Sequence, residues 1–372
     1  ARIRAPSVPS TRTRTLFSVP ENRTRTRPSP RSAFSTAAMA RANLREGVLW
    51  AVADGAEHDE VRQEMAADYV RMGCAEVKKM KVPEGNPNRA SNKRILVVGG
   101  GVSGMTAALE MAEAGYDTVL VEKSAALGGW ASQLVKRVPS MQPYADPADT
   151  GIAELAARVS AHPRIKLHLN STIAQTNGAP GRFAVDIAQE SGATVTEEVG
   201  ALIQATGFTP YDMMKLPELG AGKSPNVVDQ LGLEKLVKAA NGGPVKRPSD
   251  GGEVKSVVFI QCAGQRDEAM ESGGKHLPYC SGHCCATSIK QAMYFKDANP
   301  AIDTVVLYTD LRVPGMGEDF YRRAQEKGVT FTKGRASAVD VAGATCTVRF
   351  RDLILDEDVA LPADLVVLAT GQ

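Results

Sequence analysis

A glycine-rich turn directly after a short apolar run constrains the fold of this 372-residue chain more than any other feature. Residues 95–98 read Ile-Leu-Val-Val, which is typical of a strand buried on both faces of a parallel sheet. Gly99, Gly101 and Gly104 follow as G-x-G-x-x-G, and a helical pattern runs over residues 105–114. These glycines permit a tight turn, close approach of a pyrophosphate and close helix packing. The segment therefore predicts a βαβ unit that binds a dinucleotide.

A carboxylate and two further glycine segments indicate which dinucleotide is bound. Glu122 ends the next predicted strand, where a carboxylate accepts hydrogen bonds from ribose hydroxyls and repels a 2′-phosphate. Gly128-Gly129 and Ala205-Thr206-Gly207 are similar to segments near the flavin pyrophosphate and ribityl chain in two-dinucleotide-domain flavoproteins. We therefore predict FAD. Its predicted contacts are Gly99, Gly101, Val102, Ser103, Gly104, Glu122, Lys123, Gly128, Gly129, Ile173, Thr206 and Gly207.

The Ala-Thr-Gly pattern recurs at residues 369–371, after another apolar run. We interpret this recurrence as a flavin domain that is split by an inserted second domain. One residue departs from the flavoprotein pattern, because Trp130 follows the glycine pair where a basic residue is common. The side chain at this position lacks the charge for a phosphate contact.

Four of the six cysteines lie within 24 residues, after a strand that begins a second βαβ series. Cys262 stands where a second glycine loop is expected, and Cys280, Cys284 and Cys285 precede a helix. Four thiolates can converge on a soft metal centre, and adjacent cysteines suit the separate iron corners of a cubane better than one zinc ion. The leading interpretation is a [4Fe–4S] cluster. Structural zinc, a redox dithiol and inert thiols stay open as alternatives.

Lys290 is the candidate catalytic residue, five residues beyond Cys285 on the same predicted helix. A cation near a flavin N5 or a cluster stabilises the reduced, more negative state. The alternative is a solvated surface lysine.

The formal net charge of +2 combines two regions of opposite sign. Residues 1–40 hold eight arginines and one acid, a charge of +7, so residues 41–372 carry the difference, −5. The leader is rich in Arg, Ser, Thr and Pro, and its apolar residues do not recur at a regular spacing. This composition predicts disorder. It is either a transit peptide or sequence upstream of a true start at Met39. The acidic remainder has no basic stripe, which excludes nucleic acid, and no apolar run long enough for a transmembrane helix.

These patterns divide the chain into five parts. We expect a disordered leader over 1–40, a helical segment with a linker over 41–92, an FAD-binding domain over 93–252, a second Rossmann-like domain with the cysteine loop over 253–350, and a return to the FAD domain over 351–372. Residues 166–169, 183–187 and 199–204 are expected to form an antiparallel meander. The predicted fold class is α/β.

From residue 41 onward the sequence resembles the flavin-binding core found in the A subunit of heterodisulfide reductase. Phe-Ile-Gln-Cys-x-Gly and the later Tyr-Cys-Ser-x-x-Cys-Cys are the most specific parts of the resemblance. The residues that carry it are 95–105, 205–208, 224–227, 247–251, 259–267, 278–290, 321–323 and, more weakly, 42–46.

The resemblance implies a thioredoxin-reductase-like, two-dinucleotide-binding-domain flavoprotein, with an iron–sulfur cluster in an insertion of the second domain. By matching position, Cys262, Cys280, Cys284 and Cys285 would be the cluster ligands, and Lys290 the residue near the flavin. Relatives also carry C-terminal ferredoxin-like modules and cysteines in an N-terminal domain. Residues 41–90 contain only Cys74 and the chain stops at Gln372, so we expect a fragment.

The activity that the resemblance implies is electron transfer in an oxidoreductase complex. The protein would pass or bifurcate electrons between a low-potential carrier and a disulfide or a quinone-linked acceptor, the latter as in the related A subunit of quinone-interacting oxidoreductase. Expected partners are subunits similar to heterodisulfide reductase B and C, ferredoxin, and hydrogenase or dehydrogenase modules, with a homodimer left open. We expect a cytoplasmic location, at most peripheral to a membrane complex.

Two other functions remain open. One is an NAD(P)H-dependent FAD disulfide reductase that uses Cys284 or Cys285 in a dithiol, although the second glycine fingerprint is lost and no C-x-x-C pair occurs. The other is a non-catalytic scaffold that keeps FAD structurally.

Overall fold

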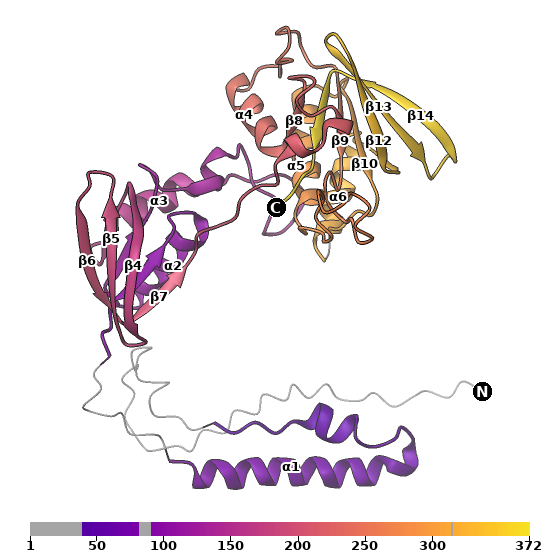
Figure 1. The fold of residues 1–372 in the computed structure, drawn as a ribbon. Coiled ribbons are helices and arrows are strands. Elements are labelled where there is room, and N and C mark those ends of the chain that lie inside the picture. Colours follow the sequence, from indigo (N-terminus) through magenta and orange to yellow (C-terminus); the bar gives the residue numbers. More distant parts are fainter. Residues whose placement is uncertain (1–38, 82–90, 314) are drawn as a thin grey trace. The chain divides into compact units, whose positions relative to one another are not determined.

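The computed structural model describes residues 39–81, 91–313 and 315–372, and the chain divides into two compact units between residues 89 and 90 (Figure 1). In the first unit, η1 (Arg45–Leu49) and η2 (Ala56–His58) precede α1 (Asp59–Lys79). Acidic residues occupy the first turn of α1 and lysines its last turn, which complements the helix dipole. Residues 1–38 of the predicted leader and most of the predicted linker lie outside the described residues.

A four-stranded parallel sheet opens the second unit. Its order is β3 (Ile165–His168), β2 (Thr118–Val121), β1 (Ile95–Val98) and β7 (Ala201–Gln204). Helices α2 (Val102–Glu113) and α3 (Ile152–Ala161) cover one face, and the antiparallel strands β4 (Ser171–Ala179), β5 (Arg182–Gln189) and β6 (Thr194–Val199) cover the other (Figure 1). Leu96 and Val97 on β1 are fully buried in the meander-side and helix-side cores, respectively. The strand is therefore buried on both faces, as predicted.

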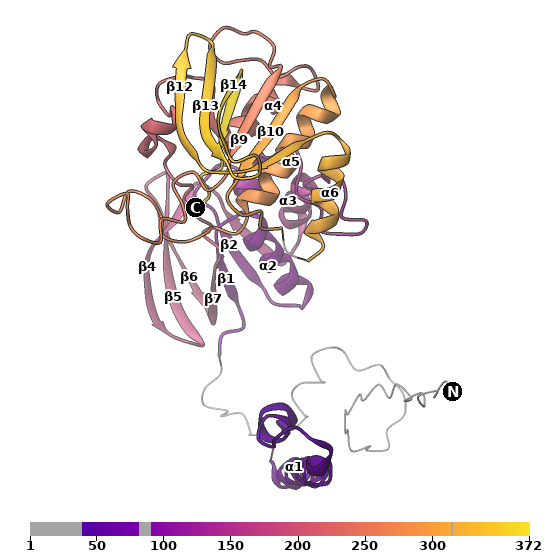
Figure 2. The ribbon, with the colours of Figure 1, turned by 90° about the vertical axis from the view of Figure 1, so that its right-hand side faces the viewer.

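A five-stranded parallel sheet follows, in the order β11 (Thr330–Lys333), β10 (Asp303–Tyr308), β9 (Ser256–Ile260), β15 (Leu365–Leu368) and β8 (Val227–Asp229). Helices α5 (Cys284–Ala298) and α6 (Gly317–Glu326) lie on the side of this sheet away from the antiparallel strands β12 (Ala336–Ala342), β13 (Thr345–Asp352) and β14 (Glu357–Ala363) (Figure 2). The short helices η4 (Met213–Lys215) and η5 (Pro217–Leu219) and the helix α4 (Gln230–Ala240) complete this part. Among the described residues, none of the helices has the length and apolarity needed to cross a bilayer.

The two parallel sheets are built by an internal repeat. In each, three parallel strands are followed by an antiparallel meander, and the next strand then inserts beside the first one. Strand β7 pairs with β1 in this way, and β15 pairs with β9. An Ala-Thr-Gly segment follows each inserted strand, at 205–207 and at 369–371. The architecture confirms the predicted α/β class with two dinucleotide-binding-type folds.

The structure corrects three predicted assignments. Residues 365–368 do not return to the first sheet but lie in the second, between β9 and β8. Residues 227–240, assigned to the FAD domain, supply β8 and α4 to the same second part. Residues 165–168 form a parallel strand rather than part of the meander. For residues 365–368 the cause is the internal repeat, since β7 and β15 are followed by the same tripeptide and the sequence does not tell which sheet each strand joins.

Candidate functional site

The glycine loop after β1 is shaped by contacts within the chain at two of its glycines. Gly99 has a φ of +106°, and a Cβ there would collide with the carbonyl of Ala205 at the end of β7. A Cβ on Gly104 would collide with the carbonyl of Gly99. At Gly101, by contrast, a Cβ would meet no described atom within 4 Å. Gly101 is therefore free of packing constraints on the side where a pyrophosphate would approach.

Glu122 holds the glycine loop from the end of β2. Its carboxylate is buried, and it accepts hydrogen bonds from the backbone N–H groups of Gly100 at 2.5 Å and Ser124 at 2.8 Å. A carboxylate has lone pairs for about four hydrogen bonds, so two remain for ribose hydroxyls. Glu122 thus positions the loop in addition to its predicted role toward the nucleotide.

The second glycine pair packs directly on the first loop. The Gly128 N–H donates to the Gly100 carbonyl at 2.8 Å, and a Cβ on Gly129 would lie 3.0 Å from the Cα of Gly101. Both glycines have positive φ, +123° and +52°. The two segments predicted to lie along the pyrophosphate are therefore joined in one cradle.

The other predicted FAD residues surround this cradle with one exception. Val102 and Ser103 are exposed at the start of α2, no described side chain caps that helix, and Lys123, Thr206 and Gly207 are exposed at strand ends. Ile173 instead lies on β4, packed against the core shared by the sheet and the meander. The roles of these residues as FAD contacts stay predictions.

Three rings connect the cradle with the cysteine segment. Trp130, in η3 (Gly129–Gln133), donates its Nε1–H to the Phe208 carbonyl at 3.1 Å, and the two rings stack with centroids 6.3 Å apart. The centroid of Phe208 lies 6.0 Å from that of His283, which immediately precedes α5. The residue that departs from the flavoprotein pattern thus has a packing role here.

The four clustered cysteines come from two loops at the carboxyl edge of the second sheet. Cys262 lies in the turn after β9, Cys280 lies before α5, and Cys284 and Cys285 begin α5. Burial raises the pKa of the Cys284 thiol to about 12, and repulsion from the other three thiols adds to this effect. Burial also raises the pKa of Cys262 and of Cys285. Burial therefore favours the neutral thiol form of Cys262, Cys284 and Cys285.

The donor set fits an iron–sulfur group. It offers four soft ligands, the Gly282 N–H lies 3.4 Å from the Cys280 sulfur, and the Arg266 guanidinium, paired with Asp310 at 2.8 Å, lowers the pKa of Cys262 against the larger effect of burial. Such donors stabilise anionic sulfur. Within the described residues, no three or more His, Cys, Asp or Glu side chains are grouped closely enough to hold a single metal ion.

Lys290 is buried in an ion pair rather than solvated. Its side chain is 2% exposed, and Nζ lies 2.8 Å from Glu234 Oε1 on α4 and donates to the Lys136 carbonyl at 2.8 Å. Burial lowers the pKa of Lys290, against the attraction of Glu234. Glu234 also accepts from the Val135 N–H at 2.7 Å. The pair therefore ties the segment beyond the glycine pair to α4 and α5.

Sequence reasoning missed Glu234 and its neighbour Tyr294. The Tyr294 hydroxyl lies 3.4 Å from both Glu234 oxygens, and burial raises the tyrosine pKa well above its ordinary value. A glutamate on an amphipathic helix is typical of a solvated face, so its position carried no signal of burial. The pairing of Glu234 with Lys290 is visible only when α4 lies beside α5.

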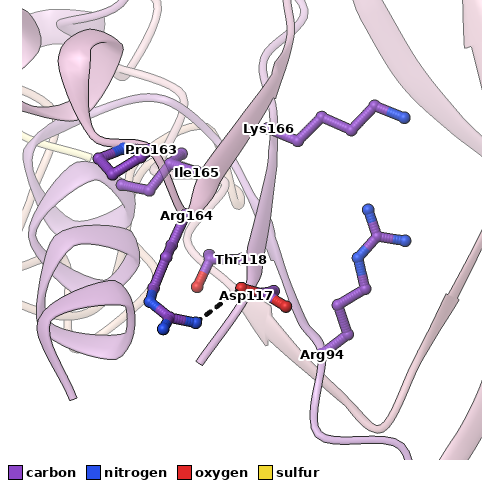
Figure 3. Close-up of a pocket in the computed structure, with 7 residues that line it drawn as sticks. All are labelled: Arg94, Asp117, Thr118, Pro163, Arg164, Ile165 and Lys166. Carbon is purple, nitrogen blue, oxygen red and sulfur yellow. Dashed lines mark hydrogen bonds and ion pairs between the residues drawn. The ribbon is translucent and has the colours of Figure 1, made fainter. Parts of the chain in front are cut away.

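A surface pocket at the amino edge of the first sheet is lined by Arg94, Asp117, Thr118, Pro163, Arg164, Ile165 and Lys166 (Figure 3). Its basic side chains are neutralised by the chain itself. Arg164 pairs with Asp117 at 3.1 Å, and both Arg94 and Lys166 pair with the buried Glu197. The two pairs with Glu197 anchor the sheet to its meander, and all three pairs lie at the edge opposite the glycine loop.

Comparisons with known proteins identify relatives of this arrangement. Residues 94–205 match the family model described as FAD dependent oxidoreductase. The A subunit of the H(2):CoB-CoM heterodisulfide,ferredoxin reductase from Methanothermobacter marburgensis is 30% identical, over 89% of this chain and 60% of the relative. One iron–sulfur A subunit of the CoB–CoM heterodisulfide reductase from Methanopyrus kandleri is also 30% identical, over 89% of this chain and 61% of the relative.

The chain thus spans about 60% of the length of these relatives. Among solved structures, the thioredoxin reductase of T. acidophilum is similar with a TM-score of 0.47 and 12% identity, over 75% of this chain and 77% of that one. The thioredoxin reductase of Lactococcus lactis gives a TM-score of 0.46 with 13% identity, over 75% of this chain and 77% of its own.

Proposed function

We propose that this chain, which is similar to the heterodisulfide reductase A subunits and matches the FAD dependent oxidoreductase model over residues 94–205, transfers electrons between FAD and a [4Fe–4S] cluster. FAD would lie on the glycine cradle of the first repeat. The cluster would be held by Cys262, Cys280, Cys284 and Cys285. Electrons would pass, or bifurcate, between a low-potential carrier and a disulfide or quinone-linked acceptor.

One observation supports this proposal most strongly. The loop after the first strand carries residues suited to a different kind of cofactor in each of the two repeats. A loop of glycines follows the first strand of the first repeat, and a loop that begins with Gln261 and Cys262 follows the first strand of the second repeat. The glycine loop offers N–H groups and a helix N-terminus to phosphates. The cysteine loop offers four thiols, with a helix N-terminus behind two of them. One fold used twice thus supplies two different kinds of cofactor site.

The residues of the chain have distinct tasks in this proposal. FAD exchanges an electron pair and a cluster exchanges single electrons, so the two together join two-electron to one-electron chemistry. Glu122 orients the glycine loop and accepts from the ribose. Lys290 and Glu234 hold the segment over residues 135–136, and the Lys290 charge favours whichever neighbouring group gains negative charge.

The partners belong to the proposal as well. The names of the relatives mention ferredoxin and a CoB–CoM heterodisulfide, and describe each protein as the A subunit of a reductase. We infer that this chain works with further subunits, which deliver and remove the electrons.

Anaerobic purification with assays of flavin, iron, acid-labile sulfide and zinc tests the proposal. The expected result is about one FAD and about four iron and four sulfide per chain. Zinc without iron, or FAD without any metal, would contradict it. The visible spectrum before and after dithionite then separates flavin bleaching from cluster reduction.

A further inference from the structure

Gln261 is a buried side chain whose amide is unpaired. The residue is 4% exposed, and neither Nε2 nor Oε1 has a hydrogen-bond partner among the described residues. In Gln265, four residues later in the chain, both amide atoms have partners. Its Nε2 donates to the Thr370 carbonyl, and its Oε1 accepts from the Ser281 N–H. Leaving a buried amide unpaired is unfavourable, so such groups call for an explanation.

The internal repeat makes Gln261 equivalent to Gly99. The Gly99 N–H donates to Val121 on the neighbouring strand, and the Gln261 N–H donates to Leu307 in the same way. Likewise, Ala205 donates to the carbonyl before Gly99, and Ala369 to the carbonyl before Gln261. The unpaired amide therefore stands at the first position of the loop that binds a cofactor in the first repeat.

Strand alternation points the Gln261 side chain toward α5. Val257 and Phe259 lie in the core that contains Cys285 and the apolar residues of α5, whereas Val258 and Ile260 lie in the core on the meander side. Because side chains alternate along a strand, Gln261 continues the series of Val257 and Phe259. Its chain neighbour is Cys262, and two further cysteines begin the helix that it faces.

We propose that the Gln261 amide donates a hydrogen bond to a sulfur atom of the iron–sulfur group and thereby raises its reduction potential. This inference rests on the proposed function. An N–H group that donates to sulfur stabilises the reduced, more negative state of a cluster. The anionic sulfur also selects the amide orientation with Nε2 toward it and Oε1 away from it. Gln261 thus contacts the group through this hydrogen bond and is not one of its metal ligands.

Two variants of the full chain test this role by redox titration of the anaerobically purified protein. Gln261→Met keeps the volume and removes the donor, and Gln261→Glu keeps the shape and adds negative charge. Both should bind as much iron as the wild type. The cluster midpoint potential should become more negative in Gln261→Met and still more negative in Gln261→Glu. An unchanged potential in both iron-loaded variants would overturn the proposal, and would mean that a water molecule alone satisfies the amide.

The metal-free protein gives a second readout that does not depend on the cluster. Gln261→Met should raise its melting temperature, because an unpaired buried amide is replaced by an apolar group. The matched control is Gln291→Met, which removes an amide that donates to Gln230 and Glu234 and should lower the melting temperature. A lower melting temperature for Gln261→Met would show that the amide is already paired, and would contradict the inference.

The failure of the proposed function has a different signature. If the wild type contains no iron, the proposed function fails before any variant is compared. If the wild type contains four iron and only the potentials are insensitive to residue 261, the role of Gln261 fails and the proposed function stands. For the iron-loaded wild type, ¹⁵N labelling should give a pulsed-EPR coupling to a side-chain amide that is lost in Gln261→Met, and its persistence in that variant would overturn the assignment.

Discussion

The loop after β1 and the loop after β9 occupy equivalent positions in two copies of one topology, yet their residues differ in kind. In the first, Gly99 and Gly104 are required by packing within the chain, and Gly101 leaves room for a phosphate. In the second, Gln261 and Cys262 replace the glycines, and the buried thiols have raised pKa values. The comparison teaches that the fold supplies a site at the carboxyl edge of its sheet, and that a few residues decide its chemistry.

The largest expected effect comes from removing one thiol. Cys284→Ala should abolish the cluster completely and leave FAD bound, because the two loops belong to different repeats. Iron and flavin assays on the purified variant measure both. Cys346→Ala is the matched control, since Cys346 is fully buried in β13 and is not among the clustered thiols. Joint loss of FAD and iron in Cys284→Ala would show that the two sites are not independent.

Breaking the buried ion pair should destabilise the fold strongly. Glu234→Ala leaves Lys290 as an unpaired buried charge and removes the acceptor of the Val135 N–H. The expected loss in the free energy of unfolding is about 3–5 kcal/mol, measured by denaturant titration. The control is Asp319→Ala, which removes an exposed pair with Arg322 at 3.3 Å and should cost less than about 1 kcal/mol. Equal costs for the two variants would contradict the role of the buried pair.

A side chain at Gly101 should separate folding from cofactor binding. In Gly101→Val the Cβ meets no described atom within 4 Å and the backbone is extended, so the melting temperature of the cofactor-free protein should be nearly unchanged. FAD affinity should fall by roughly 100-fold, or about 3 kcal/mol, because the pyrophosphate approach is blocked. Flavin fluorescence titration gives the dissociation constant. Gly104→Val, by contrast, should lower the melting temperature of the cofactor-free protein. An equally large fall in melting temperature for Gly101→Val would contradict the view that Gly101 serves cofactor binding and not folding.

The smallest effect concerns acid stability at the amino edge of the first sheet. Hydrogen bonds and ion pairs from Lys166, His168 and Arg94 hold the pKa of Glu197 below its ordinary value of 4.5, against the opposing effect of burial. Its stabilisation is therefore present above pH 4.5 and is lost as pH falls through the lower folded-state pKa. Glu197→Gln should cost about 2 kcal/mol at pH 7 and flatten the acid limb of the stability profile. If Glu197→Gln lowered the free energy of unfolding by the same amount at every pH, the role of Glu197 in acid stability would be contradicted.

Sequence reasoning was most successful where local geometry determines the residue type. Gly104 was predicted from close packing, and the Gly99 carbonyl that a Cβ there would meet is local in sequence. Gly99 was predicted from the tight turn, and its close approach to the distant Ala205 became visible only in the fold. The four cysteines were proposed as one ligand set from their spacing, and that set stays a prediction. Residues 365–368 were placed in the wrong sheet, since two repeated strands offer the same tripeptide. Glu234 and Gln261 were missed as site residues, because burial and missing partners become visible only when α4, α5 and β9 are assembled.

A stepwise anaerobic reduction of one chain, followed by flavin absorbance and by EPR, tests the central claim most directly. The claim is that the two equivalent loops hold a flavin and an iron–sulfur cluster. The account predicts uptake of about three electrons per chain, two that bleach the flavin and one that produces the EPR signal of a reduced [4Fe–4S] cluster. Uptake of only two electrons, with complete flavin bleaching and no EPR signal from a cluster, would contradict it.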